Sequence, residues 1–278
     1  GSVFFEWLYN TLLKKPCTIG NCSAIVTGML LAYTLPVTAP LWMVLIGDLF
    51  AIVIVKSLFG GIGKNFMNPA LGGRAFLMAS YPVFMTTWCK VRTSLPLFGT
   101  PADVVTGATP LSFMKEGKLP DVSMADAALG MVGGCIGEVS ALALLLGGIY
   151  LMVRKVISPI IPCTFVATVA IFCTFAQGFD MYAVAYELLG GGLFLGAIFM
   201  ATDYTTSPIT KKGKIIAGIF CGVVTCIIRL WGSLPEGVSF SIILMNVFVP
   251  YFEDWTAPTP FGFIKEKKKK KAKEETKA

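Results

Sequence analysis

The residues most suited to chemistry lie in the stretch 103–110, Asp-Val-Val-Thr-Gly-Ala-Thr-Pro. A short turn of small residues there presents the Thr109 hydroxyl; it consists of Thr106, Gly107, Ala108 and Thr109. A phosphoester on threonine needs an exposed oxygen with little bulk beside it. Gly107 and Ala108 meet this need because they let a phosphate approach the backbone closely. Asp103 could position the site for a modifying enzyme, so the stretch is a candidate cofactor attachment site.

The same stretch also fits an ordinary helix start. Thr109 would then be the N-cap residue, and Pro110 would occupy the first helical position, where its missing N–H costs nothing. The motif is short, and its residue types alone favour this second interpretation.

Three acidic residues fall inside apolar stretches that are long enough to cross a bilayer: Asp48, Glu138 and Glu187. Charged groups at membrane depth are costly and usually serve a function there. Each is a candidate to bind a cation during ion movement or to hold a proton. A hydrogen-bonded structural carboxyl is the alternative at each position.

Two polar breaks interrupt the apolar stretches, at residues 60–74 and 201–208. The first is rich in glycine and contains Asn68; the second contains Asp203 and Thr206 and ends at a proline. Backbone groups exposed at membrane depth must face protein, water, an ion or a cofactor. The two breaks are therefore candidates to hold one cofactor jointly, and a capped loop at the membrane surface is the alternative.

Apolar helices are the elements that must position these residues. The chain has 278 residues, of which 55% are hydrophobic and 14% charged. This composition predicts an all-α, polytopic membrane protein with broken helices. The expected helices lie at residues 3–13, 24–35, 41–59, 69–85, 126–153, 158–176, 181–201, 214–231 and 237–252.

A weak internal repeat extends this prediction. A short apolar segment, a proline-containing break, a full span and a glycine break follow one another in residues 24–60, and the order recurs about 170 residues later. The repeat indicates about ten transmembrane helices in two inverted halves, of which the first helix is missing from this sequence. The expected parts are a truncated first membrane half (1–85), an extracytoplasmic loop (86–124), a second membrane half (125–254) and a basic cytoplasmic tail (255–278).

The basic residues predict the orientation. Of the 23 Lys and Arg, most lie in the tail and in the loops that alternate with it on the same side. The positive-inside rule therefore places the C-terminus in the cytoplasm and Thr109 outside it. Arg74 is then expected at the cytoplasmic end of its span, too far from Thr109 to meet a phosphate there. It would anchor the helix or serve an inner cofactor.

Composition also excludes several functions. The chain has no histidine, so it holds no His-ligated haem or zinc and no Ser-His-Asp triad of its own. Its eight cysteines form no CxxC pair, which removes the usual iron–sulfur ligand spacing. The net charge of +7 comes mostly from the tail, so nucleic-acid binding is not indicated.

Three motifs in this order carry a family resemblance: NPALGGRAF, DVVTGATPLS and ATDYTTSPIT. Together they resemble the D subunit of the Rnf complex, an ion-translocating ferredoxin:NAD oxidoreductase of the bacterial cytoplasmic (inner) membrane. The B subunit of the sodium-pumping NADH:quinone reductase is the near relative. The resemblance covers nearly all of the membrane part, and the motif here has Thr106 where serine is commoner.

The resemblance implies a cofactor and partners. In that family the last threonine of the motif, here Thr109, carries FMN through its phosphate, attached by a flavin transferase. A second, non-covalent flavin (riboflavin) and a fold similar to urea transporters are also implied. The partners would be the A, B, C, E and G subunits, with Na⁺ or H⁺ as the transported ion. The chain would act as an electron-transport subunit without a complete active site of its own.

A channel or carrier for a small polar solute, with no redox role, is the alternative function. Inverted halves and broken helices would suit it equally well. The motif around Thr109 favours the electron carrier, because a channel has no use for it.

Overall fold

The computed structural model describes residues 1–89, 109–115, 120, 122–232 and 236–258. Within these ranges the chain is all α-helical and contains no β-strand, as the composition predicts. Pro36 and Cys135 form one isolated antiparallel bridge. The fold class predicted from the sequence is therefore confirmed at the level of an all-helical protein.

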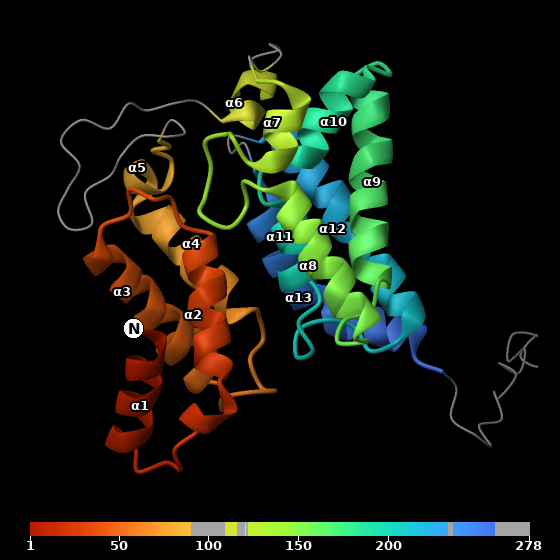
Figure 1. The fold of residues 1–278 in the computed structure, drawn as a ribbon. Helices are drawn as coiled ribbons and strands as arrows, with labels where there is room; N and C mark the ends of the chain where they lie inside the picture. The colour runs from red at the N-terminus through yellow and green to blue at the C-terminus, as the bar shows by residue number, and fades with distance from the viewer. Residues whose placement is uncertain (90–108, 116–119, 121, 233–235, 259–278) are drawn as a thin grey trace, which may run out of the picture.

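The first helices, coloured red to orange, form one side of the molecule (Figure 1). They are α1 (Ser2–Leu12), the short η1 (Ile19–Asn21), α2 (Ser23–Tyr33), α3 (Leu41–Leu49) with its π-helical continuation η2 (Phe50–Ser57), α4 (Pro69–Ser80) and α5 (Pro82–Met85). Helix α2 ends at Tyr33 with Thr34 as its C-cap, shortly before Pro36, which cannot donate a helical hydrogen bond. Helix α4 begins after Asn68, whose side chain accepts from the Ala70 and Leu71 amides, with proline at the first position.

The later helices, coloured green to blue, form the other side, and two short helices lie at one end between the groups (Figure 1). The short helices are α6 (Pro110–Lys115) and α7 (Met124–Leu129); the others are α8 (Ala141–Val153), α9 (Ile160–Ala176), α10 (Met181–Leu189), α11 (Leu193–Leu195), η3 (Gly196–Met200), α12 (Lys211–Trp231) and α13 (Val238–Thr256).

One expected span, residues 126–153, is wrong as a continuous helix. Helix α7 ends at Gly130, which adopts the left-handed conformation at φ 97° that glycine tolerates, and α8 begins only at Ala141. Glu138, expected inside that helix, lies in the intervening non-helical segment. The expected span 181–201 is also broken, because α10 and the α11–η3 segment meet at an angle of 58°.

Two clusters of buried apolar side chains hold the helices together. One contains Leu31, Met43 and Leu77 from the first helices. The other joins α9, α12 and α13 and contains Phe165 and Ile242. Helix α4 contributes to both, with Ala70 and Leu77 in the first cluster and Leu71 in the second. It therefore fixes the two groups of helices against each other.

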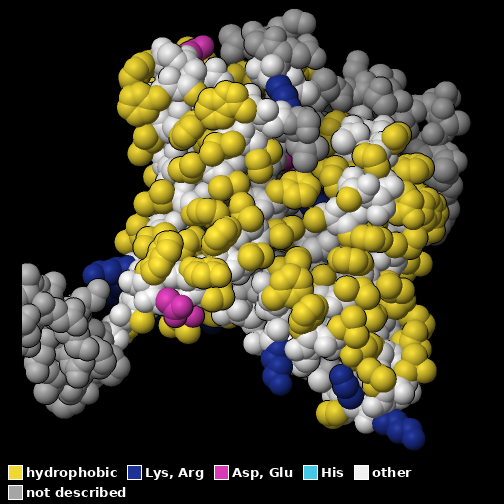
Figure 2. Space-filling model, turned by 180° about the vertical axis from the view of Figure 1, so that it is seen from behind, with side chains coloured by type: hydrophobic (Ala, Val, Ile, Leu, Met, Phe, Trp, Pro, Cys, Tyr) yellow, Lys and Arg dark blue, Asp and Glu magenta, His cyan; other side chains and the backbone are white. Residues whose placement is uncertain are grey.

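Among the described helices, α12 is long and apolar enough to cross a membrane, with a mean hydropathy of 1.9 over its best window. The bent α10 and α11–η3 segment passes the same test if it is one span, and α2, α8 and α9 are shorter apolar helices. Apolar side chains cover most of the surface seen from behind, and basic side chains gather at one end (Figure 2). The expectation of ten membrane-crossing helices stays a prediction.

Two other non-helical segments, at residues 34–40 and 130–140, lie side by side and are joined by backbone hydrogen bonds. The Ile136 amide donates to the Leu35 carbonyl at 3.1 Å, and the Gly137 amide donates to the Tyr33 carbonyl at 2.9 Å. Gly137 lies so close to Tyr33 that an added Cβ would overlap the Tyr33 Cβ and lie 3.0 Å from its Cα. This contact brings the two groups of helices together beside Cys135.

Gly137→Ala is expected to destabilise the protein by about 1–3 kcal/mol, because backbone atoms rather than a flexible side chain must move. Thermal unfolding of the purified protein in detergent measures the loss. Gly20→Ala is the matched control, since nothing lies within 4 Å of a Cβ at that position. Equal melting temperatures for the two variants would contradict the proposed close contact.

Candidate cofactor and ion sites

Thr109 lies directly before α6 and is partly buried. The Ser112 amide donates to the Thr109 Oγ at 3.3 Å, and the Ser112 hydroxyl donates to the Thr109 carbonyl at 2.7 Å. Thr109 thus occupies the N-cap position of α6, with Pro110 at the first helical position. An ester oxygen keeps lone pairs that can accept from the Ser112 amide, so capping and phosphoryl attachment are compatible.

The Thr109 side chain also lines a small cavity, here called the Thr109 cavity. Trp88, Glu138, Gly191 and Glu236 contribute to its wall, from four separate parts of the chain. The cavity volume is about 20 Å³, enough for one water molecule. Thr109 and the Trp88 ring thus share this cavity, whereas the carboxylates of its wall would repel a phosphate by like charge. A flavin ring on Thr109 would have to lie outside the volume that the described residues enclose.

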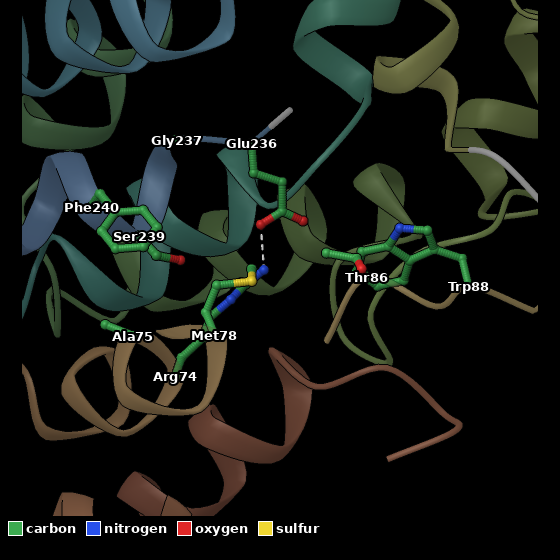
Figure 3. Close-up of a pocket in the computed structure, with 9 residues that line it drawn as sticks. All are labelled: Arg74, Ala75, Met78, Thr86, Trp88, Glu236, Gly237, Ser239 and Phe240. Carbon is green, nitrogen blue, oxygen red and sulfur yellow. Dashed lines mark hydrogen bonds and ion pairs between the residues drawn. The ribbon is translucent and has the colours of Figure 1, made fainter. Parts of the chain in front are cut away.

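A second cavity of about 20 Å³ shares Trp88 and Glu236 with the first. Arg74 from α4 enters it from one side, and Glu236, just before α13, enters from the other (Figure 3). The Arg74 Nη2 forms an ion pair with the Glu236 carboxylate. Glu236 therefore links the two cavities, because it pairs with Arg74 in one and lines the other together with Thr109.

The expectation that Arg74 lies at the surface end of its helix is wrong. The start of the glycine-rich break is exposed, for example at Gly60 and Lys64, but its end is buried: α4 begins after Asn68, which is 3% exposed and donates to the Met200 carbonyl at 3.2 Å. Arg74 itself is 3% exposed. An anchor at the membrane surface would be exposed. Arg74 instead pairs with Glu236 and lies near Glu138 inside the protein.

Glu138 belongs to the same buried region. Its Oε1 accepts from the Cys135 amide at 3.0 Å, and its Oε2 lies 3.9 Å from the Arg74 Nη1. The structure brings Glu138 and Thr109 to one cavity, which the sequence did not predict. Glu236 was missed altogether, because a single glutamate in a short loop gives no signal in the sequence.

The other two candidate acids are held by structural partners. Asp48 is 6% exposed and accepts from the Ser2 hydroxyl at 2.5 Å. Glu187 is 5% exposed and pairs with the Arg229 Nη1 at 3.0 Å. Both therefore fit the hydrogen-bonded structural carboxyl that the sequence left open, whereas Glu138 lines a cavity.

A larger cavity of about 380 Å³, here called the Asn68 cavity, lies between the two polar breaks. Asn68 and Asp203, one from each break, both line it, together with Thr27, Lys56 and Thr205. The Asn68 amide oxygen caps α4, so its polar atoms are already engaged. Thr206 donates to the Asp203 Oδ2 at 3.1 Å and thus supports Asp203 from behind the cavity wall.

Lys56 was not identified from the sequence as a site residue. It is 3% exposed and donates to the Glu6 Oε1 at 2.9 Å and to the Ser23 Oγ at 2.6 Å. Its position directly after the apolar run 49–55 was the available signal, since a lysine at membrane depth usually has a partner or a function. The remaining candidates Asp103, Thr106, Gly107 and Ala108 lie outside the described residues.

A family model and individual relatives of known name place the chain in the same family. A model of the NQR2, RnfD, RnfE family matches residues 1–262. The chain is 49% identical over 274 residues to the D subunit of the Na⁺-translocating ferredoxin:NAD⁺ oxidoreductase complex of Acetobacterium woodii, with 98% of this chain and 82% of the relative covered. It is 42% identical over 274 residues to the D subunit of the proton-translocating ferredoxin:NAD⁺ oxidoreductase complex of Clostridium ljungdahlii, with 94% and 81% covered.

A more distant relative is the D subunit of an ion-translocating oxidoreductase complex of Escherichia coli O7:K1, 34% identical over 280 residues, with 89% and 80% covered. The chain therefore belongs to the NQR2, RnfD, RnfE family of membrane proteins. The relatives are by name D subunits of redox enzyme complexes that translocate ions. The resemblance stated from the three sequence motifs is confirmed.

Proposed function

We propose that this chain is the D-type membrane subunit of an ion-translocating ferredoxin:NAD⁺ oxidoreductase and carries electrons through FMN esterified to Thr109. The position of Thr109 carries this proposal, because the residue lines a cavity beside the Trp88 ring at the start of a helix. A flavin exchanges electrons in steps of one or two, and the protein supplies its position and electrostatics. Thr109 would hold the phosphate, and Trp88 would limit the approach of water.

The test uses the fluorescence of a denaturing gel under ultraviolet light, after co-expression with a flavin transferase. Wild type is expected to give a fluorescent band, and Thr109→Val is expected to be dark. Thr100→Val is the matched control, since it removes a threonine hydroxyl outside the stretch 103–110 and should stay fluorescent. A dark wild-type band, with the transferase shown to be active on another substrate, would contradict the proposal; solute flux through a channel would then be measured.

The transported ion follows from neither the family nor the site. Two relatives of similar identity are named for different ions, Na⁺ in one case and protons in the other. We propose that the chain contributes to ion coupling through Glu138, the candidate acid that lines a cavity. The A, B, C, E and G subunits of such a complex would supply the sites for ferredoxin and NAD⁺.

The arrangement of helices supports the two inverted halves that we propose for the membrane part. After the proline-containing break at residues 34–40, α3–η2 is followed by α4. After the break at residues 201–208, α12 is followed by α13. Helices α4 and α13 then pack against each other, as equivalent elements beside a pseudo-twofold axis would. By the positive-inside rule, Thr109 faces the outside and the tail faces the cytoplasm.

The Asn68 cavity is the proposed site of a second, non-covalent flavin. Its volume of about 380 Å³ falls within the range of small-molecule sites, about 300–1,000 Å³. The wall is mostly apolar, with a few polar groups such as Lys56, Asp203 and Thr205. This composition suits an isoalloxazine ring, which needs an apolar slot with several polar contacts.

Thr27→Phe should fill this cavity and lower the amount of flavin that denaturation releases from the purified protein. Thr27 lines the cavity and is 9% exposed, so a larger side chain must project into it. Ile25→Phe is the matched control on the same helix, at a position that is 45% exposed. Both variants are made in a Thr109→Val background so that only free flavin is counted. Equal release from the two would place the second flavin elsewhere.

A further inference from the structure

Three charged side chains meet in the buried region between the groups of helices: Arg74, Glu138 and Glu236, here called the Arg74 cluster. The side chains of Arg74 and Glu138 are 3% and 4% exposed, and that of Glu236 is 14% exposed. With both carboxyl groups ionised, the cluster carries one net negative charge. A buried charge without a counter-charge is costly, so one further positive charge would stabilise the cluster.

The described groups that face the cluster do not supply that charge. The Cys135 Sγ lies 3.7 Å from the Arg74 Nη2. This sulfur and one carboxylate oxygen each of Glu138 and Glu236 all lie within 4.8 Å of one another. Arg229 reaches the cluster only through the Glu236 carbonyl, to which its Nε donates at 3.1 Å. Its Nη1 is already paired with Glu187 at 3.0 Å, so its charge is balanced there.

Two atoms of the cluster have no hydrogen-bond partner, namely the Glu138 Oε2 and the Arg74 Nε. A buried carboxylate oxygen without a partner bears the full desolvation penalty of the group. A proton on this oxygen removes the charge and turns the acceptor into a donor. A metal ion fits less well, because the Arg74 guanidinium already occupies the space beside both carboxylates.

We propose that Glu138 and Glu236 together hold one proton beside Arg74, and that charge on Thr109 changes the occupancy of this proton site. Two carboxyl groups this close resist double ionisation, so a single proton is retained between them. The second part of the proposal rests on the proposed function. Thr109, Glu138 and Glu236 line one cavity, so a negative group on Thr109 strengthens proton binding by electrostatics alone.

Infrared spectroscopy of the purified complex at neutral pH tests the first part. Wild type is expected to show the C=O stretching band of a protonated carboxyl group, shifted in D₂O. Glu138→Gln and Glu236→Gln should each lose it, because one remaining carboxylate is neutralised by Arg74. Asp126→Asn, at an exposed position on α7, is the control and should keep the band. No such band in wild type, or an intact band in both glutamine variants, would overturn the proposal.

The second part compares the pH at which the band disappears in wild type and in Thr109→Val. Loss of the phosphate charge should lower this midpoint by roughly one pH unit, a tenfold change in proton affinity for unit charges a few side chains apart. Equal midpoints with FMN present on wild type would disprove the coupling and leave the proton site standing. Absence of FMN from the wild-type gel band would instead disprove the proposed function, independently of the infrared band.

Discussion

Arg229→Met is expected to lower the free energy of unfolding by about 3–5 kcal/mol, because it leaves a buried carboxylate without its partner. Glu187 is 5% exposed and pairs with the Arg229 Nη1 at 3.0 Å. The same guanidinium donates to the backbone carbonyls of Glu187 at 2.5 Å, Gly190 at 3.4 Å and Glu236 at 3.1 Å. It therefore fixes the bend between α10 and α11 and the segment that leads into α13.

Thermal unfolding in detergent, followed by fluorescence-detected gel filtration, measures this loss. The double variant Arg229→Met, Glu187→Gln should recover part of the stability, since it removes the stranded charge but leaves three carbonyls without a donor. Arg154→Met is the matched control, because Arg154 is exposed at the end of α8. Equal melting temperatures for Arg229→Met and Arg154→Met would show that this ion pair does not stabilise the fold.

Thr109→Val should reduce ferredoxin-dependent NAD⁺ reduction by membranes to the level of membranes without the complex. Valine has nearly the shape of threonine, so the packing beside Trp88 is preserved. The lost helix cap costs roughly 1 kcal/mol, too little to unfold the chain. The activity loss would therefore report the missing electron carrier and not a damaged fold.

Thr109→Ser supplies the control, since it keeps the hydroxyl and should retain part of the activity. The amount of assembled complex is measured in parallel for each variant. Full activity in assembled Thr109→Val would show that electrons bypass this residue.

The sequence predicted the helical class and most helices because both follow from local apolar patterns. The span at 214–231 corresponds to α12, and the start of α4 at Asn68-Pro69 follows from ordinary capping chemistry. The break between Gly130 and Ser140 was missed. Its residues are apolar enough for a helix, and it is held open by backbone contacts to Tyr33 and Leu35, far away in the chain.

The Arg74 cluster could not be predicted from the sequence either, because its residues come from distant parts of the chain. Arg74 and Glu236 form an ion pair although 162 residues separate them. Charge counting assigned Arg74 to the membrane surface, because that rule assumes that each loop stays outside the membrane. The end of the glycine-rich break instead forms the start of α4, which is buried from Asn68 to Arg74. The Asn68 cavity was easier to predict, since both of its breaks are visible as polar interruptions in apolar sequence.

Mass spectrometry of the proteolytic peptide that contains Thr109 tests the central claim most directly. The complex is purified from cells that express the flavin transferase, and the peptide is fragmented to locate any added mass. We expect an added mass of FMN less one water, located on Thr109, and an unmodified peptide from cells without the transferase. An unmodified peptide from active complex, or FMN located on another residue, would contradict the claim.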